Sequence, residues 1–280
     1  MPELPELEAH AERLDSAYAG AALTRFTPLT FTALKTAVPP ASNAQGHELI
    51  FVGRRGKYLL LDFGVLTFVV HLMQGGRLKE EAPGKRPAKP KTGVARWEFG
   101  DDRSLLLTEA GTERRAGVWA VDGDPETQAP LEGLGPDANT LDPPHLMQLL
   151  QAHPMRLHGW LRDQRVLAGL GRRLANEICH RAKLSPFAST GRMEMADAQA
   201  IVEAIHATIN ESLAYERGRD TMSSSADRPG SVHHREGETC PVCGDTVRNV
   251  EYKSYEIDYC PTCQTGGKVL ADNTTSKFLK

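Results

Sequence analysis

The first residues of the chain have the repeat of an amphipathic helix. Between residues 3 and 18, apolar side chains recur at steps of three and four residues, which places them on one face of a helix. They are Leu4, Leu7, Ala11, Leu14 and the pair Ala17/Tyr18. We therefore expect a helix at the amino terminus with one apolar side.

From about residue 22 to residue 121 the pattern changes to short runs rich in valine, leucine and phenylalanine. Glycine, proline and charged turns separate these runs, and the proline- and lysine-rich stretch 82–93 is expected to be a loop. Short strands with frequent turns predict a β-sandwich or barrel. The expected strands are Leu49–Val52, Tyr58–Phe63, Leu66–His71, Arg96–Phe99, Leu105–Thr108 and Val118–Val121.

After about residue 133 the pattern is helical. We expect helices at 145–152, 156–163, 174–182 and 196–215, with a tight turn at Gly169–Leu170–Gly171 before the third. Residues 218–239 are rich in glycine, serine and arginine without periodicity, which predicts a flexible linker. The fold class is therefore α+β, with domains at 1–130, 131–220 and 221–280.

The distribution of apolar residues bears on where in the cell the protein acts. Of 280 residues, 40% are hydrophobic, yet no run of about 18 apolar residues occurs, so we expect no membrane span. The opening Met1–Glu6 lacks the basic and apolar regions of a secretion signal. We expect a cytoplasmic protein.

The charge balance alone argues mildly against a nucleic-acid partner. The chain has 33 basic and 36 acidic side chains and a net charge of −3, whereas proteins that bind duplexes usually show a basic footprint. Basic residues do cluster locally, and any one such cluster is most often a solvated face. The clusters are Arg54/Arg55/Lys57, Lys85/Arg86/Lys89/Lys91, Arg114/Arg115 and Arg172/Arg173.

Four cysteines near the carboxyl terminus have the spacing of a metal site. Cys240 and Cys243 form one pair, Cys260 and Cys263 the other, and 16 residues separate the pairs. Two such knuckles on a hairpin give a tetrahedral sulfur cage, which suits one zinc ion better than an iron centre. Because four protein ligands leave no open position, this zinc would be structural. The fifth cysteine, Cys179, is expected to be a small buried apolar residue.

The amino terminus carries a second chemical group. Removal of Met1 would leave Pro2 with a secondary amine, and an α-amino group titrates near ~8. Its uncharged form can attack an electrophilic carbon and form an iminium (Schiff base). Glu3 and Glu6 are acids beside it in sequence. The alternative is that these residues only favour a helix start.

Six segments together resemble one family. Met1–Glu6 resembles the opening of formamidopyrimidine-DNA glycosylases, and further matching segments follow in the same order along nearly the whole chain. These are Arg54–Leu61, Val69–Leu72, Asp163–Gly171 with Asn176–Glu177 after it, Val232–Glu238, and the four-cysteine segment. The chain is thus identified as a divergent member of the formamidopyrimidine-DNA glycosylase / endonuclease VIII family.

The resemblance implies an N-terminal β-sandwich with a helix, a helix–two-turn–helix DNA-binding domain and a zinc-finger hairpin. Damaged duplex DNA would lie in a cleft between two lobes, with the lesion rotated out of the stack. Pro2 would attack the sugar carbon and Glu3 would protonate the sugar oxygen. Lys57 would steady the phosphate that leaves; its alternative is an ordinary solvated lysine at a strand end.

The DNA contacts that the resemblance implies differ from the family pattern at several positions. Gly171 would offer backbone amides to a phosphate, but Arg172 follows it in place of the family's usual asparagine. Tyr255 aligns with an arginine of the family's zinc finger, and this replacement puts the second elimination in doubt. A phosphate-contacting lysine appears as His158. Arg114, followed by Arg115, would fill the gap left by the flipped nucleotide.

Two features of the sequence disagree about which lesion is removed, because Met1–Glu6 resembles the formamidopyrimidine branch and the short 218–239 segment resembles the endonuclease VIII branch.

We expect a bifunctional base-excision enzyme: a DNA glycosylase that also nicks abasic sites as a lyase, acting as a monomer. Two alternatives stay open. One is a catalytically weak protein that binds damaged or abasic DNA with the same fold, and the other is a zinc-ribbon interaction module.

Overall fold

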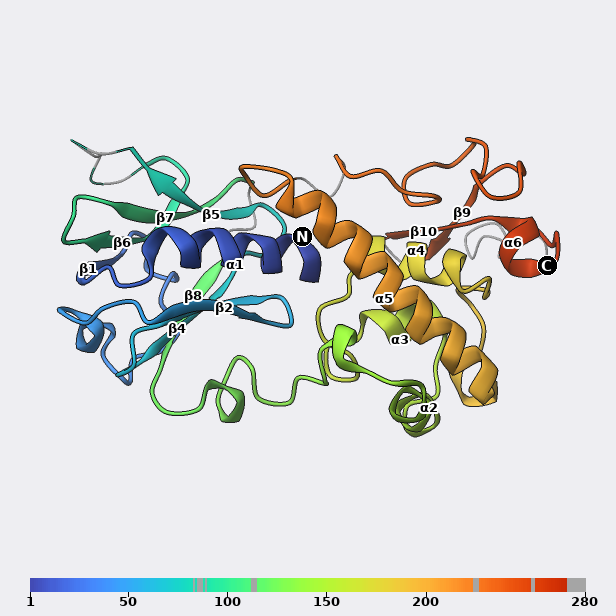
Figure 1. Cartoon of the computed structure of the whole chain (residues 1–280), viewed down its shortest axis with the longest axis horizontal. Coiled ribbons are helices and arrows are strands. Elements are labelled where there is room, and N and C mark those ends of the chain that lie inside the picture. Colours follow the sequence, from blue (N-terminus) through green and yellow to red (C-terminus); the bar gives the residue numbers. More distant parts are fainter. Residues whose placement is uncertain are drawn as a thin grey trace. The chain divides into compact units, whose positions relative to one another are not determined.

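The computed structural model describes residues 1–82, 84, 88, 90–111, 115–223, 227–252 and 255–270. The chain forms two compact units, Met1–Gly133 and Leu134–Lys280. Strands occupy the first unit, helices dominate the second, and a hairpin lies near its end, so the fold is α+β (Figure 1).

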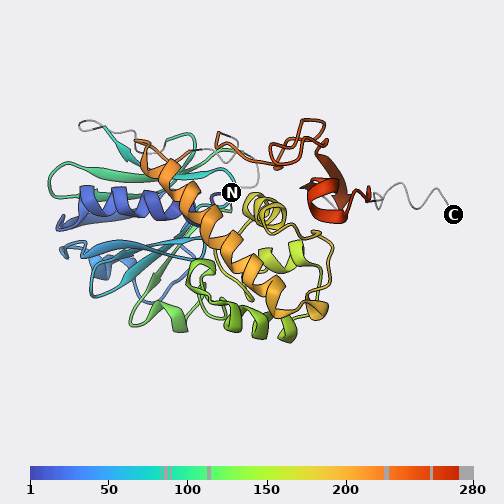
Figure 2. The same ribbon diagram turned by 45° about the vertical axis from the view of Figure 1, so that its right-hand side comes forward.

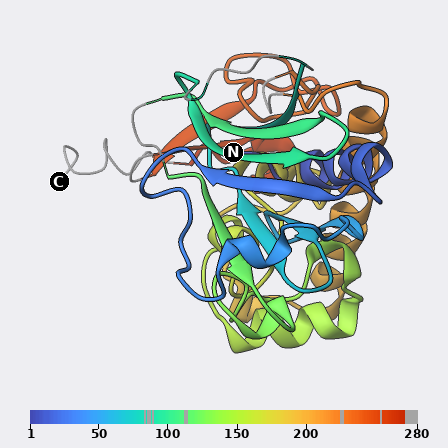
Figure 3. The same cartoon turned by 90° about the vertical axis from the view of Figure 1, so that its left-hand side faces the viewer.

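The first unit is a sandwich of two antiparallel four-stranded sheets. One sheet has the strand order β1-β6-β7-β5 and the other β2-β3-β4-β8. Helix α1 lies along the side of the sandwich between the two layers (Figures 1 and 3). The elements are α1 (Leu4–Tyr18), β1 (Leu23–Pro28), β2 (Phe51–Arg55), β3 (Tyr58–Asp62), β4 (Thr67–His71), β5 (Gly76–Glu81), β6 (Gly93–Phe99), β7 (Ser104–Glu109), β8 (Gly117–Val121) and the 3-10 turns η1 (Ala41–Ala44) and η2 (Pro125–Thr127).

Aromatic rings fill the space between the two sheets. Phe68 of β4 meets Trp97 of β6 edge-on at a centroid distance of 5.7 Å, and Phe26 of β1 lies 4.8 Å from Phe68. Phe68 and Trp97 are fully buried. The apolar face of α1 is also buried, as its repeat predicts.

All six expected strands are present, but β1 and β5 were not expected. Both are edge strands of one sheet. In β5 the only buried apolar side chain is Leu78, and in β1 it is Leu23. The strands β2 and β8 also lie at a sheet edge, but apolar runs mark them in the sequence, whereas polar and charged residues interrupt β1 and β5.

The second unit packs helices around the long helix α5, which is the orange helix in Figure 2. Ile201, Ile205 and Ile209 are buried along one face of α5, as their four-residue repeat predicts. The elements are η3 (Ala138–Thr140), α2 (Pro143–Ala152), α3 (Leu157–Arg162), α4 (Arg172–Arg181), η4 (Thr190–Arg192), α5 (Met195–Arg217), β9 (Arg248–Tyr252), β10 (Tyr255–Tyr259) and α6 (Pro261–Thr265). No helix in the described ranges is long and apolar enough to cross a membrane.

The prediction of a flexible linker is wrong for residues 228–233, which α4 holds. The carboxylate of Glu177 accepts hydrogen bonds from the amides of Ser231 (2.8 Å) and His233 (2.9 Å). The guanidinium of the buried Arg173 donates to the carbonyls of Arg228 and Pro229. Polar contacts rather than apolar periodicity fix this segment, so a pattern of hydrophobic residues does not detect it.

Candidate active site and metal centre

Helix α1 fixes the amino terminus. Glu3 is its N-cap, and a reciprocal capping box joins Glu3 to Glu6, with the Glu3 amide donating to Glu6 Oε2 at 3.0 Å. Both carboxylates are buried, and so is Pro2. Glu3 and Glu6 thus do stabilise the start of a helix, as the alternative interpretation predicted. This arrangement also places two acids beside the terminal amine.

The surroundings of the amino terminus favour an uncharged amine. Burial lowers the pKa of the terminal amine; the charges of Glu3 and Glu6 oppose this shift, and the charges of Arg77 and Lys57 add to it. The amine described is that of Met1, one residue before Pro2. Arg77 was missed in the sequence because it lies on the unexpected edge strand β5.

Lys57 occupies the tight turn between β2 and β3, after Gly56 with its φ of +54°. Only 5% of Lys57 is exposed, so the reading as an ordinary solvated lysine is wrong. Burial of a cation is costly unless the cation is paired. Its charge acts on the amino terminus and also on His71.

His71 joins this group from the end of β4. Burial first, then the charges of Lys57 and the amino terminus, lower its pKa to about 4, so the ring is neutral at pH 7. Its Nδ1 atom accepts a hydrogen bond from the Met73 amide at 3.2 Å, and its ring packs on Tyr58 at 4.6 Å. The sequence places His71 in a resembling segment but does not identify it as a site residue.

The residues expected to contact DNA are only partly described. Gly171 is the N-cap of α4, and Arg172, the first helical residue, is exposed. Arg115 is exposed, and Arg114 lies outside the described residues. The backbone of Tyr255 pairs with Tyr252 in the hairpin, while its side chain lies outside the described part.

His158 does not offer a surface cation. It is fully buried in α3, and burial lowers its pKa to about 3, while hydrogen bonding of the ring to the Asn176 side chain and to the Arg172 backbone acts in the opposite direction. Asn176 in turn donates to Asp258 of β10 at 2.9 Å. His158, Asn176 and Asp258 therefore connect α3 and α4 with the hairpin. Because His158 lies in the core, it cannot replace a phosphate-binding lysine.

The four cysteines of the two knuckles come together. The Sγ atoms of Cys240 and Cys263 are 3.9 Å apart, and those of Cys243 and Cys260 are 3.3 Å apart. Zinc–sulfur bonds of ~2.3 Å at tetrahedral angles put sulfurs about 3.8 Å apart. These two distances lie near that value, and the sulfurs of Cys240, Cys260 and Cys263 all lie within 4.8 Å of one another, so the thiols are compatible with a zinc ion. Helix α6, which begins at Pro261, shapes the second knuckle.

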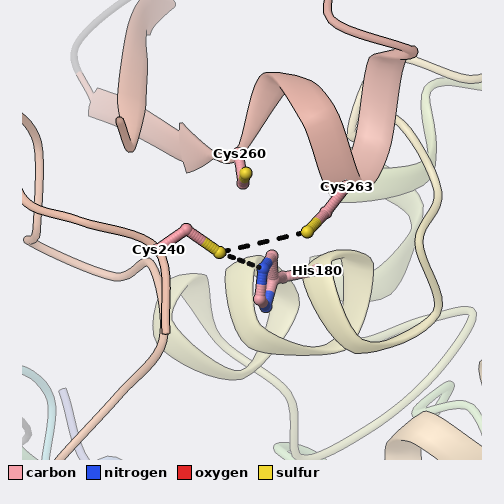
Figure 4. Close-up of side chains that lie close together, drawn as sticks. All are labelled: His180, Cys240, Cys260 and Cys263. Carbon is pink, nitrogen blue, oxygen red and sulfur yellow. Dashed lines mark hydrogen bonds between the residues drawn. The ribbon is translucent and has the colours of Figure 1, made fainter. Parts of the chain in front are cut away.

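A fifth donor, His180 of α4, was not expected. Its Nε2 atom lies 3.3 Å from Cys240 Sγ, and the ligand atoms of His180, Cys240, Cys260 and Cys263 all lie within 4.8 Å of one another (Figure 4). No spacing rule could identify it, because His180 is 60 residues before Cys240. Its neighbour Cys179 is fully buried, which confirms the expectation of a small core residue, and burial raises the pKa of its thiol.

Comparison with known proteins gives two family matches. Residues 1–119 match the formamidopyrimidine-DNA glycosylase N-terminal domain, and residues 133–225 match the formamidopyrimidine-DNA glycosylase H2TH domain. The formamidopyrimidine-DNA glycosylase of Methylococcus capsulatus is 31% identical over 94% of this chain and all of its own length. A formamidopyrimidine-DNA glycosylase-like protein of Mycobacterium tuberculosis, itself uncharacterized, is 41% identical over 56% of this chain and 99% of its own.

A solved structure supports the same architecture. The Lactococcus lactis formamidopyrimidine-DNA glycosylase, non-covalently bound to DNA with an abasic site, superposes with a TM-score of 0.80. It is 19% identical, and the match covers 94% of this chain and 99% of that one. This likeness concerns the fold.

Proposed function

Because the chain belongs to the formamidopyrimidine-DNA glycosylase / endonuclease VIII family, we propose that it is a bifunctional enzyme of base-excision repair. It removes oxidised bases from duplex DNA as a glycosylase and nicks the resulting abasic site as a lyase. It acts as a monomer in the cytoplasm, associated with the nucleoid through its DNA substrate.

One observation carries this proposal: Pro2 is buried at the front of α1, directly before Glu3, and the charges of Glu3, Glu6 and Lys57, all buried, act on the adjoining amino terminus. An uncharged secondary amine is the nucleophile that Schiff-base chemistry needs. The family implies this chemistry for Pro2, and the electrostatics of this chain agree with it.

The reaction then divides among these residues. The Pro2 nitrogen attacks the C1′ carbon of the damaged nucleotide; the bond to the base breaks, and the base leaves with the bonding electron pair and the proton that the amine gives up. Glu3 protonates the ring oxygen of the sugar, which opens and leaves an iminium between Pro2 and C1′. The iminium acidifies the proton on C2′; its loss expels the 3′ phosphate, whose charge Lys57 stabilises. Hydrolysis of the iminium releases the amine.

One structural zinc ion completes the proposed enzyme. Cys240, Cys243, Cys260 and Cys263 would hold it, and their sulfur spacing supports this assignment. Held by these four ligands, zinc would stabilise the fold of the hairpin β9–β10 and would leave no open coordination position for chemistry. The proposed partner of the hairpin and of the α4 N-terminus, with Gly171 and Arg172, is the phosphate backbone of damaged duplex DNA. Arg114, Arg115 and Tyr255 are proposed as further DNA contacts.

A second candidate is a protein that binds damaged or abasic DNA with little catalysis. The burial of His158 supports it, because one phosphate contact expected in the family cannot form there. Arg172 and Tyr255, in place of the family's asparagine and arginine, point the same way. This candidate predicts retained affinity without turnover.

A strand-incision assay separates the two. Purified protein is incubated with matched duplexes that carry one oxidised purine, one oxidised pyrimidine, one abasic site or no lesion. The proposal predicts nicking of the abasic duplex and of at least one oxidised duplex, but not of the undamaged one. Binding to the damaged duplexes without any nick would overturn the proposal in favour of the second candidate, and the preferred lesion identifies the branch.

A further inference from the structure

His180 connects the helix that begins at Gly171 with the cysteine cluster. It lies near the end of α4, is 4% exposed, and directs its ring at the sulfurs (Figure 4). Further contacts dock the finger on the same region: Gln264 of α6 donates to the Leu184 carbonyl at 3.1 Å, and Asn176 of α4 donates to Asp258 of β10 at 2.9 Å. His180 is thus one of several polar links between α4 and the finger.

The centre has five candidate donors: the four cysteine sulfurs and His180, whose ligand atom lies within 4.8 Å of those of Cys240, Cys260 and Cys263. Zinc in a structural site is four-coordinate, and the two knuckles already supply four sulfurs, in pairs 3.9 Å and 3.3 Å apart. The fifth donor, His180 Nε2, approaches Cys240 Sγ at 3.3 Å, a distance at which an imidazole N–H donates to sulfur. The chemistry therefore favours four thiolate ligands and one hydrogen bond to them.

This hydrogen bond would stabilise the negative charge of the metal centre. Four thiolates and one Zn²⁺ carry a net charge of −2, and Cys240 and Cys260 are fully buried. Buried charge needs hydrogen-bond donors, and groups that donate to metal ligands typically change metal affinity about 10–100-fold. A neutral imidazole with its proton on Nε2 is such a donor.

We propose that His180 donates a hydrogen bond from Nε2 to the Cys240 thiolate of the zinc-loaded protein, and so couples zinc retention to helix α4. His180 is a positioning residue here, not a ligand. The inference rests on the zinc assignment of the proposed function and does not depend on glycosylase or lyase activity.

Zinc release measures this coupling directly. His180 and Cys263 both line a cavity of about 590 Å³ between α4, α5 and the 228–231 segment, which gives a chelator a route to the centre. Release to a colorimetric chelator is followed for the wild type, His180→Phe and His180→Gln. His153→Gln, at an exposed histidine of the same unit, is the control. Circular dichroism checks that each variant is folded.

We expect zinc to leave His180→Phe about 10-fold faster or more, and His180→Gln, which keeps an N–H donor, to lie nearer the wild type. The absorption spectrum of the Co²⁺-substituted protein should show four thiolate ligands in the wild type and in His180→Phe alike. Unchanged release from folded His180→Phe would overturn the inference. So would a Co²⁺ spectrum that shows three thiolates and one nitrogen in the wild type.

A measurement of metal content, made first, distinguishes a failure of the zinc assignment from a failure of the His180 inference. Purified full-length protein that contains no zinc would contradict the zinc assignment, and with it this inference. Protein that contains one zinc but is indifferent to His180 would contradict this inference alone.

Discussion

The amide of Glu3 donates a hydrogen bond of 3.0 Å to the carboxylate of Glu6. This contact makes the residue after Pro2 the cap of a well-packed helix, so α1 determines where the terminal amine lies. The same pair of carboxylates opposes the effect of Arg77 and Lys57 on the pKa of that amine. Helix capping and the proposed chemistry therefore depend on the same side chains.

Glu3→Gln separates the two roles. The amide keeps an oxygen that can accept the capping hydrogen bond, so we expect little change in thermal stability. It cannot supply a proton to the sugar oxygen as the acid does, so we expect iminium formation, and the strand nicking that follows it, to slow about 10²–10⁴-fold. Nicking rates on abasic DNA and melting temperatures check this, with Glu12→Gln, at an exposed carboxylate of the same helix, as the control. Equal loss of stability and activity would argue for capping alone.

Arg77→Met tests the electrostatics of the amine. Because the charge of Arg77 lowers the pKa of the amine, its removal raises that pKa, and less of the amine is uncharged at a given pH. The rising limb of the pH–rate profile on abasic DNA should therefore move to higher pH. Lys79→Met, on the same strand with an exposed side chain, should not move it. Coincident profiles for Arg77→Met and the wild type would contradict this account.

Cys240→Ser tests the metal centre. Loss of one thiolate from a closed four-sulfur site should lower zinc content and DNA affinity together, because the hairpin depends on the metal for its fold. Cys179→Ala, at a buried cysteine outside the centre, should leave both near the wild-type level. A Cys240→Ser protein that lacks zinc but binds DNA at full strength would show that the finger has no part in binding.

Arg172→Ala tests the phosphate contact at α4. An exposed arginine at a helix N-terminus that meets one phosphate should contribute about one unit to the salt dependence of binding. We expect weaker binding to all duplexes, damaged or not, and a slope of log affinity against log salt that is smaller by about one. Arg192→Ala, at another exposed arginine of the same unit, is the comparison. If both variants keep the wild-type slope, Arg172 does not touch the backbone.

Apolar periodicity predicted α1 and the four main helices, and short apolar runs in the sequence predicted the strands β2, β3, β4, β6, β7 and β8. These patterns missed β1 and β5, which are edge strands with a single buried apolar side chain each. Cysteine spacing predicted the ligand pairs, since a knuckle is local. His180, His71 and Arg77 come from distant elements, and only the tertiary fold brings them to their sites. The burial of Lys57 likewise depends on how the β2–β3 turn packs.

The central claim is that the nitrogen of Pro2 becomes bonded to deoxyribose. Incubation of the protein with an abasic duplex and borohydride, followed by peptide mapping of the reduced adduct, tests it most directly. We predict one covalent adduct, located on the amino-terminal peptide at Pro2. The adduct should be lost in Pro2→Gly and also in a protein whose amino terminus, after removal of Met1, carries one additional residue before Pro2. An adduct on a lysine, or full trapping by the extended protein, would contradict the account.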